Sequence, residues 1–171
     1  MLQDLKYVLF WWLILFLVGS LSLPLILSVF KNFWDRGYIF SKTVSLVIVT
    51  YIVFVLGIFK FLSFTSSNIF LIIVLFLVAN LAFLFQKQRR QSFFSEVKKH
   101  QKIFLLEELI FLSVLIFWSY IRGFDPNINS LEKFMDWGFI NSILRSTYMP
   151  PADMWYAGEP INYYYFVQSI T

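Results

Sequence analysis

The acidic residues of one polar stretch near the end of the chain are best placed for chemistry. Half of the ten acids lie between positions 121 and 160: Asp125, Glu132, Asp136, Asp153 and Glu159. Glu132 and Asp136 are four residues apart, so a helix would place both on one face, where like charges cost about 0.2–0.5 kcal/mol. Such a pair suits a general base or a site for a cation. A solvated helix face, with Glu132 as a cap and Asp136 paired to Lys133, is the simpler interpretation, and spacing alone favours it.

Basic and aromatic residues around these acids are candidates for substrate binding: Arg122, Lys133, Arg145, Tyr163, Tyr164 and Tyr165. Arg122 directly follows an apolar run, where contact with a phosphate or lipid headgroup and simple interface anchoring explain it equally well. Three consecutive tyrosines point in three directions on a helix. We therefore expect at least one hydroxyl to face the protein or a cavity, and the others to belong to an aromatic belt.

The composition indicates the class of protein that positions these residues. Apolar residues make up 59% of the 171 residues and charged residues only 14%, against about 25% in soluble domains. This predicts an integral membrane protein. The net charge of +4 does not indicate nucleic-acid binding, because the basic residues cluster at the ends of apolar runs. Without cysteine, and with His100 as the single histidine, thiolate and histidine-cluster metal sites are excluded.

Four apolar runs predict membrane-spanning helices, since about 20 residues cross a bilayer core of about 30 Å. The spans are expected at about 7–30, 43–64, 69–85 and 103–120. Pro24 is expected to kink the first. Residues 121–160 then form a polar loop, and 161–171 begin a fifth helix that the chain end cuts off, so we expect a longer protein. The predicted fold class is all-α, a polytopic transmembrane helix bundle.

Few ionisable residues fall within these spans. Lys60 lies near the end of the second, and Glu107 and Glu108 lie in the first turns of the fourth. Because Lys102 precedes the two acids by about one turn, an ion pair at headgroup level is the expected explanation. A transporter would place ionisable residues deeper in its helices, so this pattern disfavours one.

A short amphipathic helix is predicted within the polar loop, over 130–145, lying on the membrane surface. Its apolar residues recur at helical spacing: Leu131, Phe134, Met135, Ile140, Ile143 and Leu144. Asn129, three residues before Glu132, resembles one half of a helix capping box. The acidic pair would therefore lie on a helix with one apolar face.

The charges of the loops predict the orientation in the cell membrane. The linker 86–102 carries six basic residues against one acid, and the linker 31–42 carries three more, whereas the turn 65–68 has none. By the positive-inside rule both basic linkers are cytoplasmic. The N-terminus, the turn and the loop 121–160 are then outside.

Two stretches resemble a known family: DRGYIFSK at 35–42 and RGFDPNINSLEKFMDWGFINSILRSTYMPPADMWYAGEPINYYYF at 122–166. They are similar to the bacterial and archaeal YYY membrane proteins (Chlor_Arch_YYY), which are named for the tyrosine triplet. The resemblance covers essentially the whole chain. It implies a longer protein with many spans, and it assigns no activity.

The loop also resembles, more distantly, the first extracytoplasmic loop of GT-C glycosyltransferases, which use polyprenyl-phosphate sugar donors. The resemblance implies that Asp136 is the catalytic base, with Glu132 as the alternative, and that membrane lipid and a polyprenyl-phosphate-sugar are partners. A cationic group or a divalent cation at the acidic loop would neutralise the leaving phosphate. In many such enzymes the two acids are adjacent in the sequence, whereas Glu132 and Asp136 are four residues apart. The competing hypothesis is a non-enzymatic transporter or assembly scaffold.

The orientation can be tested by cysteine labelling on intact cells. Because the chain has no cysteine of its own, single replacements report one position each. Ser66→Cys and Asn127→Cys should react with an impermeant thiol reagent, whereas Ser92→Cys should react only after the membrane is opened. Labelling of Ser92→Cys from outside would overturn the orientation.

Overall fold

Helices make up the regular structure of this chain. The computed structural model describes residues 2–124, 127, 131–156, 158–163 and 165–170, and among them the side chains of 5–124, 127, 133–156, 158–163 and 165–169. Within these residues there is no β-strand, and one isolated bridge joins Ala152 to Pro160. The predicted all-α membrane class is confirmed.

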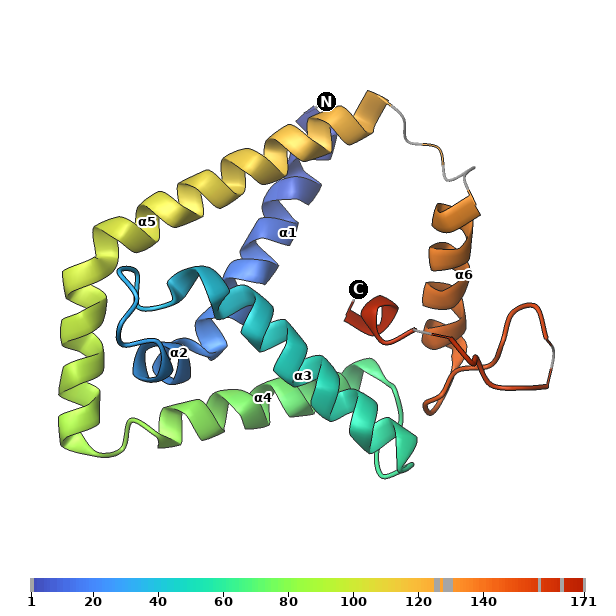
Figure 1. Cartoon of the computed structure of the whole chain (residues 1–171), viewed down its shortest axis with the longest axis horizontal. Helices are drawn as coiled ribbons and strands as arrows, with labels where there is room; N and C mark the ends of the chain where they lie inside the picture. The colour runs from blue at the N-terminus through green and yellow to red at the C-terminus, as the bar shows by residue number, and fades with distance from the viewer. Residues whose placement is uncertain (1, 125–126, 128–130, 157, 164, 171) are drawn as a thin grey trace. The chain divides into compact units, whose positions relative to one another are not determined.

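Six α-helices and two short 3₁₀ helices follow one another along the described chain (Figure 1). Their bounds are α1 Leu2–Leu21, α2 Leu23–Val29, η1 Tyr38–Phe40, α3 Ser41–Ile58, α4 Ser66–Ala82, α5 Lys87–Phe124, α6 Leu131–Arg145 and η2 Val167–Ile170. Helix α6 covers the short helix predicted over 130–145.

Two helices of the described chain are long and apolar enough to cross a membrane. They are Tyr38–Ile58, which joins η1 to α3, and α5. Helices α1 and α2 add a third crossing if the bent pair is one span, and α4, with 17 residues, is apolar but shorter. The four crossings expected from the sequence therefore stay a prediction.

The first apolar run is broken where proline predicts a kink. Helices α1 and α2 meet at an angle of 58° around Ser22, and Pro24 lies in the first turn of α2. Proline cannot continue the hydrogen-bond ladder of α1, because it lacks a backbone N–H. The hydroxyl of Ser22 donates to the carbonyl oxygen of Gly19, at 3.3 Å, and to that of Ser41, at 3.1 Å. The break is thereby tied to the start of α3.

Three boundaries differ from the sequence-based expectation. All of the expected linker 86–102 except Gln86 is the first part of α5, because the segment holds strong helix formers and neither glycine nor proline. Helix α3 ends at Ile58, ahead of a turn in which Lys60 has a φ of +57°. Among the described residues 161–163 and 165–170, where a fifth helix was expected to begin, the helical structure is the one turn of η2.

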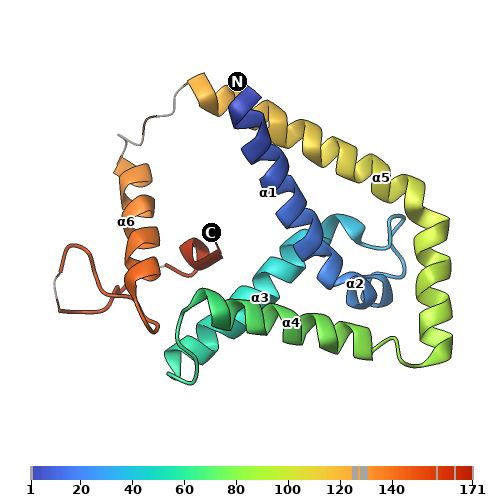
Figure 2. The ribbon, with the colours of Figure 1, turned by 180° about the vertical axis from the view of Figure 1, so that it is seen from behind.

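The chain divides into two compact units, Met1–Leu46 with Phe76–Pro126, and Val47–Leu75 with Asn127–Thr171. We call them unit 1 and unit 2. In unit 1, α5 is bent and encloses α2, as both views show (Figures 1 and 2). The core at this bend consists of Leu27, Tyr38 and Phe104, with Leu23, Phe93 and Val97 packed against it. The start of α1 and the end of α5 lie at the same end of unit 1 (Figure 2).

Unit 2 is built around the buried face of α6. Phe139 and Ile143 are each 2% exposed, and Met149 and Ile161, from the segment after α6, are also buried. The segment after α6 returns along the helix: the amide of Ile161 donates to the carbonyl oxygen of Pro151, at 2.9 Å. Tyr163 and Gln168 of this segment contact α6, the helix that carries Asp136.

Candidate functional site

Asp136 is held in place by a residue from the end of the chain. It is half-buried on α6, and its Oδ1 accepts a hydrogen bond from Nε2 of Gln168 at 2.9 Å. Lys133, one turn earlier, donates from Nζ to the backbone carbonyl oxygen of Asn127 at 3.3 Å. Asp136 is therefore a positioned carboxylate, and its contact to Gln168 was not part of either interpretation of the sequence.

The structure describes some of the other predicted site residues and not others. The side chain of Glu132 and the whole of Asn129 are not described, so the shared face of the two acids and the capping box stay predictions. Arg145 is exposed in the last turn of α6, where a positive charge interacts favourably with the helix dipole. Arg122 lies in the last turn of α5, in unit 1.

A cavity of about 710 Å³ lies in the segment that follows α6. Its polar and aromatic lining consists of Asp153, Tyr156, Glu159, Asn162, Tyr163 and Tyr165. Tyr163 and Tyr165 of the tyrosine triplet thus line one cavity, whereas Tyr164 lies outside the described residues. Asp136, Lys133 and Arg145 are not among the residues that line the cavity.

Backbone hydrogen bonds shape the wall of this cavity. Oδ1 of Asp153 accepts from the amides of Trp155 and Tyr156, at 2.7 and 3.0 Å, and the amide of Asp153 donates to the carbonyl oxygen of Glu159 at 2.8 Å. Gly158 has a φ of +96°, which a residue with a side chain rarely adopts. The turn thus brings the two carboxylates of Asp153 and Glu159 to one cavity. The sequence analysis did not select them, although their position between Pro151 and Pro160 was the available signal.

Aromatic contacts anchor the same segment to α6. The ring of Phe139, which is buried, lies 5.9 Å from that of Trp155 and 6.0 Å from that of Tyr163, between centroids. Trp155 itself is 64% exposed. An exposed indole beside an acidic cavity is a surface suited to a ligand with an apolar face.

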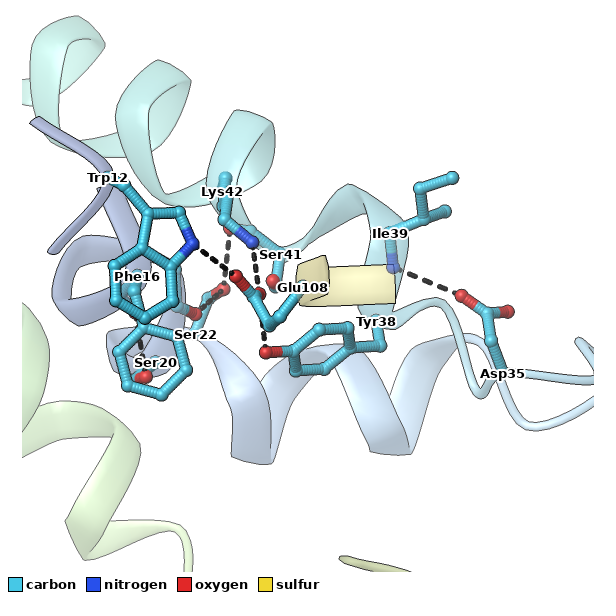
Figure 3. A network of polar contacts seen from close by, with 11 residues as sticks. Trp12, Phe16, Ser20, Ser22, Asp35, Tyr38, Ile39, Ser41, Lys42 and Glu108 are labelled. Atoms are coloured by element: carbon cyan, nitrogen blue, oxygen red, sulfur yellow. Dashed lines mark hydrogen bonds and ion pairs between the residues drawn. The ribbon is translucent and has the colours of Figure 1, made fainter. Parts of the chain in front are cut away.

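A second polar cluster lies in unit 1 and is centred on Glu108 (Figure 3). Glu108 is 6% exposed. Its Oε1 accepts from the hydroxyl of Tyr38 at 2.6 Å and pairs with Nζ of Lys42. Its Oε2 accepts from Nε1 of Trp12 at 3.1 Å. One carboxylate therefore joins α1, η1, α3 and α5.

The donors of this cluster are themselves held by their surroundings. The ring of Tyr38 stacks on that of Phe104, with centroids 4.3 Å apart. The amides of Gly37 and Ile39 each donate to the carboxylate of Asp35 at 3.0 Å, and Asp35 is 1% exposed. Figure 3 shows Asp35 bonded to the turn that carries Tyr38. Asp35 thus fixes the position from which Tyr38 reaches Glu108.

The expected ion pair between Lys102 and the two acids is wrong for Glu108. The partner of Glu108 is Lys42, from another helix, and Lys102 is exposed. Helix geometry explains the error. Only residues three or four apart share a face, whereas Lys102 is five residues from Glu107 and six from Glu108. Both oxygens of Glu107 are shielded from solvent and have no hydrogen-bond partner among the described residues.

Removal of one charge from the buried pair should destabilise the protein. Glu108→Gln leaves the ammonium group of Lys42 without its counter-charge, and we expect a loss of about 3–5 kcal/mol. Adding Lys42→Met should restore part of that loss, because the unpaired charge is removed. Thermal unfolding of the purified protein in detergent measures both. A double variant no more stable than Glu108→Gln would contradict the pairing.

The described residues do not suggest a metal centre. Among them, no group of three or more His, Cys, Asp or Glu side chains is arranged to hold a metal ion. A cation at the acidic loop would need ligands from outside the described part or from its substrate.

Comparison with known proteins gives a family but no activity. A family model described as "Uncharacterized membrane protein (DUF2298)" matches residues 48–171, well over half of the chain and all of unit 2 except Val47. Neither a curated protein nor a solved structure matches the chain. The matched region includes α6, the cavity of unit 2 and η2. The chain belongs to the uncharacterized membrane protein family DUF2298.

Proposed function

We propose that the protein is a membrane glycosyltransferase of the GT-C type, which takes a sugar from a polyprenyl-phosphate donor at the outer face of the membrane. The cavity of unit 2 is the observation that carries the proposal. It combines tyrosine rings with carboxylates and an amide, and sites for small ligands typically pair aromatic surface with a few convergent polar groups. The resemblance of the loop to that of GT-C enzymes also supports it.

The chemistry requires a base, and Asp136 is our candidate. A carboxylate would take the proton of an acceptor hydroxyl while that oxygen attacks the anomeric carbon. The bond from that carbon to the phosphate oxygen breaks, and the polyprenyl phosphate leaves with the electron pair. The amide of Gln168 holds one oxygen of Asp136, which would orient the other toward an acceptor. A basic residue or a divalent cation would stabilise the leaving phosphate.

Two other carboxylates compete for this role. Asp153 and Glu159 line the cavity, which Asp136 does not. Oδ1 of Asp153, however, already accepts two backbone amides, so this carboxylate holds the turn that shapes the cavity. Asp136 accepts the side-chain amide of Gln168 and is the residue that the resemblance to GT-C enzymes selects.

A transporter is the second candidate, and Glu107 favours it. An ionisable residue inside a membrane-spanning helix commonly marks an ion pathway. The oxygens of Glu107 are shielded and have no hydrogen-bond partner among the described residues. Glu108 does not favour it, because both of its oxygens are bonded within unit 1. No observation favours the assembly scaffold.

The proposal predicts that Asp136→Asn abolishes sugar transfer. The amide keeps the shape and can still accept the bond from Gln168, but it cannot take a proton. Turnover should fall by about 10²–10⁴, while the abundance of the protein in the membrane stays near wild type. The measurement is consumption of a radiolabelled polyprenyl-phosphate sugar by membranes of the natural host carrying the substitution.

Three further variants decide between the candidates. Glu132→Gln and Asp153→Asn, each neutralising one acid of the same loop, should retain turnover. If one of them is inactive while Asp136→Asn is active, the base is wrongly assigned and the transferase proposal stands. If all three acids are dispensable, none of Asp136, Glu132 and Asp153 is the base. Loss of ion-coupled uptake in Glu107→Gln, with no sugar transfer in wild type, would favour the transporter.

A further inference from the structure

Unit 1 contains a second cavity, of about 540 Å³, which no step of the proposed reaction uses. It lies between α2, the junction of α4 with α5, and the first turns of α5. Its apolar lining includes Leu27 of α2 and Phe93 of α5. Its volume falls in the range of about 300–1,000 Å³ typical of small-ligand sites.

The polar lining of this cavity is predominantly basic. Lys31, Arg36 and Arg89 contribute three cations, against the single carboxylate of Glu96. Arg36 pairs with that carboxylate, at 2.9 Å between NH2 and Oε2. Lys31 and Arg89 have no acidic partner in the lining, so the cavity carries an excess of positive charge.

Two of these cations are held in position. The guanidinium of Arg89 lies 4.3 Å from the centroid of the Phe83 ring, over its face. Arg36 has a φ of +56°, a strained conformation for a residue with a side chain, and it donates to the carbonyl oxygen of Lys31. Strain of this kind persists where the surroundings impose it, commonly at ligand sites.

The start of α5 adds to the positive potential. The residues Gln86, Gln88 and Arg89 around the first turn of this 38-residue helix line the cavity. The first turn contains no acidic residue, so no side chain of that turn neutralises the partial positive charge of the helix N-terminus. An anion in the cavity would meet this end of the helix as well as the cations.

We propose that this cavity binds the headgroup of an anionic phospholipid. The cations would meet the phosphodiester, and the polar side chains of Ser28, Gln86 and Ser92 would accept or donate bonds at its ester and hydroxyl oxygens. The apolar lining residues suit the glycerol and upper acyl carbons of a lipid better than a free phosphate ion. Basic cavities between membrane helices bind anionic lipids in this way. The site is independent of the sugar chemistry proposed for unit 2.

The test measures lipid binding by the purified full-length protein in detergent. Native mass spectrometry and the rise in melting temperature are recorded with phosphatidylglycerol, with phosphatidylcholine and with inorganic phosphate. We expect saturable binding of phosphatidylglycerol alone. Lys31→Gln with Arg89→Gln should weaken it about 30-fold, from about 1 kcal/mol per basic residue. The matched control, Lys98→Gln with Lys99→Gln, removes the same charge from exposed positions of α5 outside the cavity and should bind as wild type.

Three outcomes would overturn the proposal. Equal loss in the cavity and control variants would mean that diffuse surface charge holds the lipid. Equal binding of phosphatidylcholine would exclude recognition of the anionic headgroup, and protection by inorganic phosphate alone would assign the cavity to free phosphate. Should the double variant unfold without lipid, the single changes Lys31→Gln and Arg89→Gln are measured instead, each with an expected loss of about fivefold.

Discussion

The carboxylate of Glu108 takes its hydrogen-bond donors from three elements that are distant in the sequence. Tyr38, Lys42 and Trp12 lie 70, 66 and 96 residues away. A charge removed from water costs several kcal/mol unless it is paired and fully hydrogen-bonded. Here both oxygens are bonded and the ammonium group supplies the counter-charge. Helices α1, α3 and α5 can therefore meet only where all three donors reach Glu108, and this requirement determines the packing of unit 1.

Unit 2 is organised by apolar burial and turn geometry instead. Phe139 and Ile143 are buried on one face of α6, and the segment after it, with three prolines and one glycine, folds back so that Gln168 bonds to Asp136 of that helix. Of the carboxylates that the structure describes in this unit, Asp153 and Glu159 line a cavity and Asp136 is bonded to Gln168. The difference between the units suggests a division of roles. Glu108 is fully bonded to residues that pack unit 1, whereas Asp136, Asp153 and Glu159 lie in surroundings where a carboxylate can act on a ligand.

Local patterns predicted the local structure well. The kink at Pro24, the helix over 130–145 and the all-α membrane class follow from proline chemistry, helical spacing and hydropathy, each of which operates within a few residues. The continuity of α5 was missed because the drop in hydropathy at 86–102 was interpreted as a loop, although a polar segment without glycine or proline remains a good helix.

Long-range contacts could not be predicted in the same way. Nothing in the spacing of Lys42 and Glu108 shows that they meet, and the bond from Gln168 to Asp136 depends on how the segment after α6 returns. Asp153 and Glu159 were visible as acids between prolines, but their common cavity depends on a turn with one left-handed glycine. The sequence therefore identified the region of the candidate site and one of its carboxylates, not the arrangement of its residues.

A transferase of the proposed kind consumes a lipid-linked sugar at the membrane. The most direct measurement compares the polyprenyl-phosphate sugars of the natural host with those of a strain lacking the gene, by mass spectrometry of lipid extracts. We expect one such donor to accumulate in the deletion strain and to return to the parental level when the wild-type gene is restored. An unchanged pool of every polyprenyl-phosphate sugar would contradict it.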